Sequence, residues 1–525
     1  MFDHDALTAQ SVQECEVIDD VQPMMLSKLL HGVTVTKMFQ TVYGRMVVTH
    51  DVEVHGLQYD SRKVVLGDLF VAISGTGVDG HKYIHHAVNN GAKVVVVEDD
   101  EVMPDSFFMH AGVVKVVVPN SRITLAQIAS NYYGNPSSKL TMLGVTGTNG
   151  KTTTTHLLKS ILEEQGNRTG LIGTIEYKIG NEVIPATHTT PESLELNEML
   201  ARMVEHRCSS AVMEVSSHAL HQHRVHGIHF NVAVFTNLTQ DHLDYHGSIE
   251  EYFKAKKILF DTLDPSAWTI VNTDDEWGKQ IYNSVRSNKI AFGMNTSTDV
   301  RAKDVACSLS GTQFTILHGC EETVIRSSLI GGFNVSNILA AFSTGIALGI
   351  PKSTLQRAIR EAETIRGRFE PIVAPQGWTA VIDYAHTPDA LRKALMAVRD
   401  LLMLNQQGRI ITVFGCGGNR DKTKRPIMGR IAEGLSDIVV VTSDNPRHEN
   451  SEIIVDEVMK GIKNHDNVHR EADRKTAIHY ALGRAQNGDV VLIAGKGHED
   501  YQVIGNQKIH FSDKEVVEEF IRSHA

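Results

Sequence analysis

The sequence predicts an α/β protein of three domains, with a central P-loop ATPase sheet and a C-terminal doubly wound, Rossmann-like domain. Three observations support this prediction. The chain has 525 residues, too many for one ordinary domain. Strand-like and helix-like segments alternate almost throughout, which is typical of largely parallel sheets. An apolar run also leads into a glycine-rich loop and a helix at "TMLGVTGTNGKTTTTHLL" (141–158).

The N-terminal domain is predicted over residues 51–138. The apolar runs "KVVVVE" (93–98) and "VVKVVVP" (113–119) have the β-branched composition of buried strands. A short helix ending at a glycine is expected in "YIHHAVNNGA" (83–92). The polar turn "NYYGNPSSKL" (131–140) is a candidate linker to the next domain. Residues 1–50 are interpreted as an acidic extension, to which the sequence assigns no role.

The central domain, residues 139–363, is expected to place polar residues at the ends of its strands. This pattern occurs in "SSAVMEVSS" (209–217), "NVAVFTNLTQDH" (231–242) and "WTIVNTDDE" (268–276). The carboxyl ends of parallel strands are where open α/β sheets bind ligands. The helix "SIEEYFKAKKILF" (248–260) carries three lysines, and its composition alone favours a solvated basic face.

A new alternation of strands and helices predicts the third domain over residues 364–525, after a boundary near "EAETIRGRFEPI" (361–372). Its strands are expected in "TAVIDYA", "RIITVFGCGG", "DIVVVTSDNPR" and "DVVLIAGKGHED". A length of roughly 150 residues is usual for a separate domain.

Composition limits the classes of function. The chain is 42% hydrophobic and 22% charged, as globular proteins are, and its net charge of -11 disfavours a nucleic-acid or membrane-surface role. Five cysteines without metal-type spacing indicate reduced thiols. The first residues are acidic and polar, unlike a signal or transit peptide. We therefore expect a cytoplasmic monomer without nucleic-acid or membrane partners.

The glycine loop is predicted to bind the phosphates of a nucleotide. Successive backbone N–H groups in such a turn bind anions, and the N-terminus of the following helix adds positive potential. Lys151 would reach the outer phosphates, and the Thr152 hydroxyl would ligate magnesium. Val145 stands where the standard pattern has its first glycine, so an ordinary glycine turn is the alternative.

Switch proteins, kinases and ATP-driven ligases all use such a loop. We find no Asn-Lys-x-Asp segment of the kind that reads guanine in GTPases. Glu214 ends a predicted strand, where its carboxylate can hold a cation, and His242 follows the next one among further acidic and histidine residues. A single histidine is more often a surface residue than a ligand, but this clustering favours His242 as a ligand.

Further motifs then narrow the choice. In order along the chain, these are "GVTGTNGKTTT", "MEVSSHALHQHR", "FTNLTQDHLDYHG", "YFKAKKILF", "GRFE", "VIDYAHTPDAL", "GCGGNRDKTKRP", "DNPR" and "AGKGHEDYQ". From about residue 55 to the C-terminus, this series resembles the Mur ligases, and most of all the members that add the third amino acid of the peptidoglycan stem peptide.

The resemblance implies an ATP-dependent amide-bond ligase of cytoplasmic peptidoglycan precursor synthesis. Its substrates would be UDP-N-acetylmuramoyl-L-alanyl-D-glutamate, meso-diaminopimelate and ATP, with Mg²⁺ as cofactor. A substrate carboxylate would attack the γ-phosphate of ATP to give an acyl phosphate, from which the incoming amine displaces phosphate. Two anions must meet in this step, so cations have to neutralise their charge.

The resemblance also assigns residues to roles. Catalysis would involve Lys151, Glu214, His242 and Lys256. Magnesium would be held by Thr152, Glu214, His242 and Lys256, the last modified to a carbamate (N6-carboxylysine). ATP would contact Gly147, Thr148, Asn149, Gly150, Lys151, Thr152, Thr153, Asn334, Asn337, Arg368 and Asp383. The last four residues of this set have a cap or fold-stabilising role as their alternative.

The nucleotide-sugar dipeptide would contact residues of two segments by the same resemblance. These are Tyr59, Ser61, Thr76, Gly77 and Val78 near the start of the N-terminal domain, and His188, Thr189, Thr190, Ser216, Gln222 and Arg224 in the central domain. Without the resemblance, "DSR" (60–62) and "GTGVDG" (75–80) would be interpreted as ordinary turns.

The segment "SDNPRHEN" (443–450) is the most discriminating part of the resemblance, because the family selects its amino acid there. Diaminopimelate differs from lysine by a carboxylate on the distal carbon, which the planar guanidinium of Arg447 can bind bidentately. The rest of the pocket would consist of Arg420, Asp444, Asn445, Pro446, Gly495 and Glu499, with Glu499 facing an ammonium group. A proline turn after a strand is the alternative for the segment alone.

Two other functions are weighed against this one. A related ligase with another acceptor, such as a folate polyglutamylating or lysine-adding enzyme, is disfavoured by the "DNPR" loop and the uridine-type N-terminal segment. A non-catalytic nucleotide-binding scaffold is disfavoured because it would not need Lys151, Glu214, His242 and Lys256 together.

Overall fold

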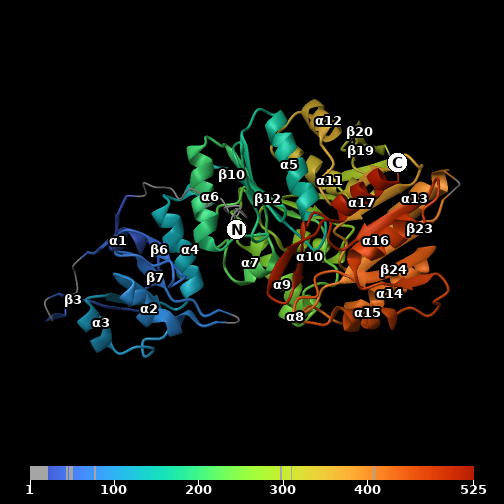
Figure 1. The fold of residues 1–525 in the computed structure, drawn as a ribbon. Coiled ribbons are helices and arrows are strands. Elements are labelled where there is room, and N and C mark those ends of the chain that lie inside the picture. The colour runs from blue at the N-terminus through green and yellow to red at the C-terminus, as the bar shows by residue number, and fades with distance from the viewer. Residues whose placement is uncertain are drawn as a thin grey trace, which may run out of the picture. The chain divides into compact units, whose positions relative to one another are not determined.

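The computed structural model describes residues 22–42, 45–46, 51–75, 78–295, 298–308, 310–405 and 408–524. They fold into two compact units, in each of which helices cover the sheets (Figure 1). One unit contains the chain up to Pro136 together with Ser193–Arg202, and the other contains Ser137–Glu192 and Met203 onward. Among the described residues, we find no helix with the length and apolarity needed to cross a membrane.

A five-stranded sheet of order β2-β9-β8-β7-β6 forms the centre of the first unit. Strands β6 to β9 are parallel, and β2 is antiparallel to β9 at the edge. The strands are β1 (Met24–Met25), β2 (Lys37–Phe39), β3 (Thr41–Val42), β4 (Arg45–Met46), β5 (Glu53–Val54), β6 (Leu57–Gln58), β7 (Leu69–Val71), β8 (Val94–Val97) and β9 (Val114–Val117). The helices are α1 (Leu26–Leu29), η1 (Gly80–Tyr83), α2 (Ile84–Asn89), α3 (Asp105–Ala111) and α4 (Ser121–Tyr132).

Part of the expected N-terminal extension belongs to this first unit. Leu26 and Leu29 of α1 are buried in the same core as the valines of β8 and β9, and β1 pairs with β5. The apolar side chains of α1 supply the reason, because they remove hydrocarbon surface from water. Residues 1–21 lie outside the described residues.

An eleven-stranded sheet of order β13-β12-β11-β14-β10-β15-β16-β17-β18-β19-β20 dominates the second unit. Its strands are β10 (Thr141–Thr146), β11 (Thr169–Ile172), β12 (Glu176–Ile179), β13 (Glu182–Pro185), β14 (Ser210–Glu214), β15 (Val232–Phe235), β16 (Trp268–Asn272), β17 (Asn288–Gly293), β18 (Val300–Ser308), β19 (Gly311–His318) and β20 (Glu321–Ser327). Its helices are η2 (Pro136–Lys139), α5 (Lys151–Glu164), α7 (Ser217–His221), α8 (Leu243–His246), α9 (Ile249–Asp261), α10 (Glu276–Ser284), α11 (Gly332–Ala347) and α12 (Lys352–Glu361). Helix α6 (Ser193–Glu205) follows β13 in the chain, but its residues Ser193–Arg202 belong to the first unit.

The strand order explains why the glycine loop is a binding site. Strand β10 lies between β14 and β15 and is parallel to both, so the chain crosses over in opposite directions on its two sides. Ligands bind at such switch points in open α/β sheets. Antiparallel strands at both edges, β12–β13 and β18–β20, were not predicted from the sequence.

A six-stranded sheet of order β21-β22-β26-β23-β24-β25 follows in the same unit and is parallel except for β21. Its strands are β21 (Glu370–Val373), β22 (Thr379–Asp383), β23 (Ile410–Cys416), β24 (Ile438–Ser443), β25 (Val468–Arg470) and β26 (Val490–Ala494), followed by the hairpin β27 (Tyr501–Ile504) and β28 (Gln507–His510). The helices are α13 (Pro388–Asn405), α14 (Lys424–Leu435), α15 (Ser451–Met459), α16 (Arg474–Leu482) and α17 (Asp513–Ser523).

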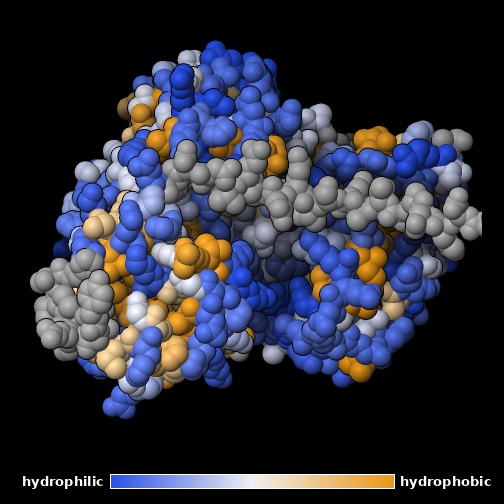
Figure 2. Space-filling view, turned by 60° about the vertical axis from the view of Figure 1, so that its left-hand side comes forward, coloured by the Kyte–Doolittle hydropathy of each residue, from blue (hydrophilic) through white to orange (hydrophobic). Residues whose placement is uncertain are grey.

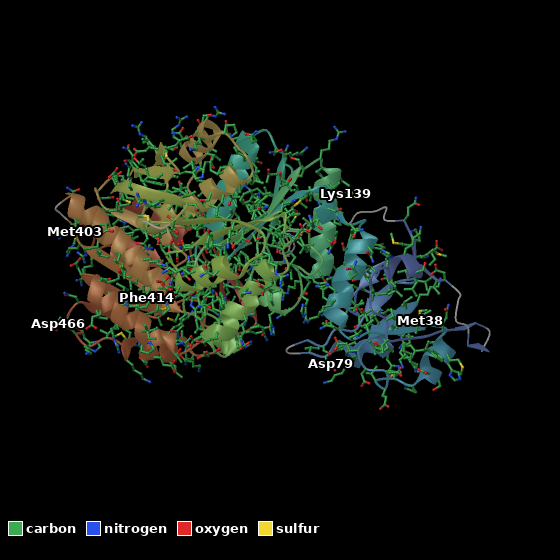
Figure 3. The ribbon with its side chains drawn as sticks, turned by 180° about the vertical axis from the view of Figure 1, so that it is seen from behind. Met38, Asp79, Lys139, Met403, Phe414 and Asp466 are labelled. Atoms are coloured by element: carbon green, nitrogen blue, oxygen red, sulfur yellow. The ribbon has the colours of Figure 1, made fainter. Side chains whose placement is uncertain are left out.

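Alternate residues of this sheet build two separate cores. Phe414 and its neighbours on one face pack against α13, α14 and α15, whereas the other face packs against α16 and α17. Figure 3 shows Phe414 inside this part of the unit and the exposed Met403 at its margin. This arrangement is the doubly wound fold expected for the C-terminal domain. On the face in Figure 2, hydrophilic residues predominate and hydrophobic residues gather in small groups.

Candidate active site

A cavity of about 530 Å³ lies at the carboxyl ends of the parallel strands in the second unit. The glycine loop after β10 lines it, together with Glu214 at the end of β14 and Asn272 at the end of β16. Residues of the six-stranded sheet complete the wall, among them Asp383 at the end of β22 and Arg420. The cavity therefore joins residues from the expected central and C-terminal domains.

Two glycines give the loop its shape. Gly147 and Gly150 have φ angles of 151° and 86°, which side chains rarely adopt. A Cβ atom at Gly147 would overlap the hydroxyl of Thr236, and one at Gly150 would overlap the amide of Asn337. Helix α5 begins directly after the loop at Lys151, so its N-terminal N–H groups point toward the cavity. This geometry is that of an anion-binding turn.

A half-buried lysine and a fully buried one share one backbone oxygen of this loop. The carbonyl of Gly147 accepts hydrogen bonds from Lys151 Nζ at 3.0 Å and from Lys256 Nζ at 2.8 Å. Burial lowers the pKa of Lys151, and burial together with the charge of Lys151 holds the pKa of Lys256 well below its usual value. Lys256 Nζ also lies 4.6 Å from the ring centre of Tyr252. Burial and the charge of Lys151 thus act against the charged form of Lys256, whereas the carbonyl of Gly147 and the ring of Tyr252 act in its favour.

The carboxylate of Glu214 is completely buried and only partly engaged by the protein. Oε1 accepts from the backbone N–H of Thr174 at 2.9 Å, and Oε2 accepts from the Thr174 hydroxyl at 3.0 Å. That hydroxyl also lies 3.0 Å from the hydroxyl of Thr189. Each carboxylate oxygen has two lone pairs, so capacity remains for a cation.

Asp241 and His242 are neighbours beside the lysines, with His242 Nε2 3.4 Å from Asp241 Oδ2. Burial raises the pKa of Asp241, but the charges of His242, His386 and Lys424 outweigh it and lower this pKa to about 2. Burial, together with the charges of Lys256 and His386, lowers the pKa of His242 to about 4. At neutral pH, His242 is therefore a neutral imidazole, the form that ligates metals.

The residues predicted to hold magnesium are compatible with that ion. Among the described residues, no three His, Cys, Asp or Glu side chains converge as a preformed metal cluster. Mg²⁺ usually binds one or two protein groups and takes its other oxygens from phosphates and water. The buried Glu214 carboxylate and the Thr152 hydroxyl, both on the cavity wall, fit this mode of binding.

The four residues predicted to contact ATP from further along the chain all line the cavity. Arg368 donates from Nη2 to the Thr152 hydroxyl at 2.9 Å and stacks on the ring of Tyr384. Asn337 donates to Asn334 Oδ1 at 2.9 Å. Asp383 accepts from the backbone N–H groups of Phe369 and Ala385, and burial raises its pKa. Asn334 also donates to Ile330 O, so some of these residues stabilise the fold as well.

The loop is bonded to the C-terminal sheet by side chains. Asn149 Nδ2 donates to Asp389 Oδ2 at 3.1 Å, and Lys393 Nζ lies 2.8 Å from the same oxygen. Asp389 is in the first turn of α13, where its charge also favours the helix N-terminus. Together with the bond from Arg368 to Thr152, these contacts tie the two sheets together across the cavity.

Residues predicted to bind the dipeptide fall into two groups. Thr189 and Ser216 line the cavity. Thr190 is buried, and its hydroxyl donates to the carbonyl of Glu214 at 2.8 Å. Arg224 bonds to Glu192 and to Gln222 Oε1, so these side chains are held by the protein, whereas His188 is exposed.

The predicted uridine-binding residues belong to the first unit. Ser61 is buried, with its hydroxyl 3.1 Å from His86 Nδ1, and the hydroxyl of Tyr59 donates to Glu195 at 2.7 Å. Val78 is exposed. Thr76 and Gly77 lie outside the described residues.

The predicted amino-acid residues cluster at the ends of β24 and β26. Asn445 Nδ2 donates to Glu499 Oε2 at 2.8 Å, and Lys496 Nζ lies 3.1 Å from the same oxygen. Asp444 is buried next to Gly495, and its Oδ1 accepts no hydrogen bond from the described residues. Burial and the charge of Asp444 raise the pKa of Glu499. Two acids, Asp444 and Glu499, surround one lysine, Lys496, so the charge of this cluster allows a further positive group to bind.

The arginines of this cluster flank a glycine turn. Arg447 Nη1 donates to the carbonyl of Gly418 at 2.9 Å. A Cβ at Gly417 would lie 2.9 Å from Arg447 Nη1 and 3.8 Å from Arg420 Cγ, so both arginines are near this turn. Arg420 lines the cavity, and the loop through Pro446 brings Arg447 beside it. The "DNPR" turn thus joins the residues around Glu499 to the cavity wall.

Comparison with known protein families agrees with this geometry. Three family models match the chain: Mur ligase family, catalytic domain, at residues 53–133; Mur ligase middle domain, at 145–345; and Mur ligase, glutamate ligase domain, at 367–497. The chain belongs to the Mur ligase family. As a Mur ligase, the protein is an ATP-dependent ligase.

Curated relatives of this Mur ligase cover nearly its whole length. A protein of Clostridium botulinum is 43% identical over 473 residues, which are 90% of this chain and 95% of the relative. One of Gloeobacter violaceus is 45% identical over 89% of this chain and 94% of its own. Both are named UDP-N-acetylmuramoyl-L-alanyl-D-glutamate--2,6-diaminopimelate ligase.

Solved structures agree on the fold of this Mur ligase. One named UDP-N-acetylmuramoyl-L-alanyl-D-glutamate--2,6-diaminopimelate ligase has a TM-score of 0.64 and 31% identity, covering 90% of this chain and 95% of the other. The MurF ligase of Thermotoga maritima in complex with ADP has a TM-score of 0.62 at 22% identity, covering 89% and 98%. The latter likeness bears on the fold alone.

The structure of this Mur ligase adds residues that sequence reasoning did not assign. Asp241, in the loop after β15, and His386, in the loop after β22, both line the cavity, and Tyr252 packs against Lys256. Asp389 contacts the loop through Asn149. Asp241 was noted only as part of a cluster, although its position next to His242 at a strand end was a usable signal. The contact of Asp389 joins residues far apart in the chain and leaves no such signal.

Proposed function

We propose that this Mur ligase joins meso-diaminopimelate to UDP-N-acetylmuramoyl-L-alanyl-D-glutamate, with cleavage of ATP to ADP and phosphate. The observation that carries the proposal is the cluster of side chains around the "DNPR" turn. Arg447 lies near the cavity wall, beside Arg420, and the carboxyl groups of Asp444 and Glu499 are neighbours in the same cluster. A guanidinium matches the distal carboxylate of diaminopimelate, and the two acids match an ammonium group. The names of the curated relatives support the same substrate.

The chemistry would proceed in two steps. The D-glutamate carboxylate forms a bond to the γ-phosphorus of ATP while the bond to ADP breaks, giving an acyl phosphate. The ammonium group of diaminopimelate first loses a proton to solvent, and the free amine attacks the acyl carbon. Phosphate leaves with its bonding electrons and takes up the second proton, which the nitrogen loses as the amide forms. The loop N–H groups and Lys151 hold the phosphates, and the remaining cavity residues orient the carboxylate.

Mg²⁺, when bound, would supply charge neutralisation between the carboxylate and the triphosphate. Thr152, Glu214 and His242 would hold it, together with a carbamate on Lys256. An uncharged, buried amine reacts with CO₂, which the low pKa of Lys256 favours. The resulting anion would also lie near the cationic Lys151, because both side chains bond to the carbonyl of Gly147.

The remaining assignments extend the same proposal. ATP would contact the loop and the four residues opposite it, the muramoyl dipeptide would contact Thr189 and Ser216, and the uridine would be held in the first unit. The division into domains at residues 51–138, 139–363 and 364–525 also remains part of the proposal. We place the enzyme in the cytoplasm as a monomer, and the four described cysteines, which are free thiols, are consistent with that compartment.

Phosphate release tests the proposal directly. We expect release from ATP and Mg²⁺ with UDP-N-acetylmuramoyl-L-alanyl-D-glutamate only when meso-diaminopimelate is added, and not with L-lysine. Release with lysine alone would leave a ligase but overturn the substrate assignment. Folded protein that binds ATP and releases phosphate with neither amine would point to another acceptor or to an inactive scaffold.

Replacing Arg447 with alanine should weaken the use of diaminopimelate. A lost charge-assisted hydrogen bond is worth about 1.5–3 kcal/mol, or roughly tenfold to more than hundredfold in affinity. We expect the KM for diaminopimelate to rise by that factor while the KM for ATP stays nearly constant. Steady-state kinetics with each substrate varied in turn measures both, and an equal rise in both KM values would contradict a role in side-chain selection.

A further inference from the structure

The loop that carries Arg447 is held by the strand that follows Glu499. Strand β27 begins at Tyr501 and is not part of the six-stranded sheet. Gln502 Nε2 donates to the backbone carbonyl of Asp444 at 2.6 Å and to the hydroxyl of Ser443 at 3.0 Å. The side chain of Gln502 therefore bonds to Ser443, the last residue of β24, and to Asp444, the first residue of the "DNPR" turn.

The backbone of the same strand fixes Arg447 itself. Arg447 has a φ of 54°, a left-handed conformation that is uncommon for residues other than glycine. Its N–H donates to the carbonyl of Val503 at 2.9 Å, and its carbonyl accepts from Gly505 at 2.7 Å. Both backbone polar groups of Arg447 are thus bound by the hairpin, which compensates for the unfavourable conformation.

Asn445 connects the two ends of this segment. Its Nδ2 donates to Glu499, whereas its Oδ1 accepts from the N–H of Val503 at 2.9 Å. The extended chain from Glu499 to Val503 consequently sets the separation between an acid and the turn that presents Arg447. An amino acid with an ammonium at one end and a carboxylate at the other must match that separation.

We propose that Gln502 is a positioning residue that determines the preference for an amino acid with a distal carboxylate, by fixing the turn of Arg447 against strand β27. This inference rests on the proposed function. Gln502 acts through Arg447 and does not itself contact the substrate. Its loss should therefore affect the selection of the amino acid and leave the use of ATP unchanged.

The test compares Gln502→Met with the matched variant Gln507→Met. Methionine keeps the length of glutamine without the N–H donor, and Gln507 is an exposed residue of β28 on the same hairpin. For Gln502→Met, we expect the KM for diaminopimelate to rise about tenfold, as for the loss of one to two hydrogen bonds. The ratio of kcat/KM for diaminopimelate over lysine should fall by a similar factor. Gln507→Met should match the wild type.

A double-mutant cycle identifies the path of the effect. In an Arg447→Ala background, Gln502→Met should cause no further loss of selectivity, because the two residues act as one unit. Additive losses, or an unchanged ratio in the single variant, would overturn the inference. If Gln502→Met does not fold, as judged by ATP-dependent thermal stabilisation, Gln502→Glu keeps the shape without the donor and is expected to show the same loss.

The outcomes separate this inference from the proposed function. Wild-type enzyme that releases no phosphate with diaminopimelate would refute the function. Wild-type enzyme that does so, with a Gln502→Met variant of unchanged selectivity, would refute only the role of Gln502.

Discussion

Replacing Lys256 with methionine should lower kcat by about a thousandfold, the upper range for removing one preorganised electrostatic group from an active site. Methionine keeps the buried volume but can neither bond to the carbonyl of Gly147 nor carry a carbamate. The loss should fall on kcat, because the loop that binds ATP remains intact. Phosphate release at saturating substrates measures it.

Neighbouring lysines of helix α9 provide the control. Lys254 pairs with Glu251 at the exposed surface, and the half-buried Lys257 pairs with the exposed Asp261. Methionine at either position should change kcat by less than about twofold, because exposed ion pairs contribute little. Intact-protein mass spectrometry at neutral pH should also find one added CO₂ in the wild type and none in Lys256→Met. A Lys256→Met variant with near-normal kcat would remove Lys256 from the mechanism.

Replacing Asp513 with asparagine should destabilise the second unit by about 3–5 kcal/mol, because the change leaves a buried guanidinium without its counter-charge. Arg474 and Asp513 are both completely buried and joined by two hydrogen bonds of 2.7 and 2.8 Å. Arg474 also donates to the carbonyls of Ser443 and Ala494, the last residues of β24 and β26. Urea unfolding followed by fluorescence measures the change in free energy.

A second ion pair on the same two helices serves as the comparison. Lys475 of α16 and Glu519 of α17 pair at 2.8 Å, with 46% and 53% of their side chains exposed. Glu519→Gln should therefore cost less than about 1 kcal/mol. Equal costs at Asp513 and Glu519 would show that burial does not govern the strength of these pairs.

Much of the fold could be predicted because its signals are local. The valine run at 94–97 and the apolar run before the glycine loop are buried strands, and hydrophobic composition alone identifies them. The glycine loop was equally accessible, since the φ angles of Gly147 and Gly150 exclude other residues. The antiparallel edges of the large sheet were missed because partly exposed strands such as β18 carry a weaker apolar signal.

The site was less accessible because it depends on contacts between distant segments. Lys256 was chosen over Lys254 and Lys257 only by resemblance, although it shares a buried face of α9 with Tyr252 and Leu259, a spacing that indicates an inward position. No sequence pattern joins Asn149 to Asp389, because that contact requires the packing of two sheets. The hydrogen bond from Gln502 to Asp444 in the "DNPR" turn likewise joins residues that are far apart in the chain.

The hydroxyl of Thr174 lies between two groups with different proposed ligands. It donates to Glu214, assigned to magnesium, and lies 3.0 Å from the hydroxyl of Thr189, assigned to the dipeptide. Its proton goes to Glu214, and its oxygen can accept the proton of the Thr189 hydroxyl. A dipeptide that takes the Thr189 proton would therefore weaken the hydrogen bond that ends on Glu214. The two affinities are then linked, and linkage is reciprocal: whatever factor the dipeptide applies to metal binding, the metal must apply to dipeptide binding.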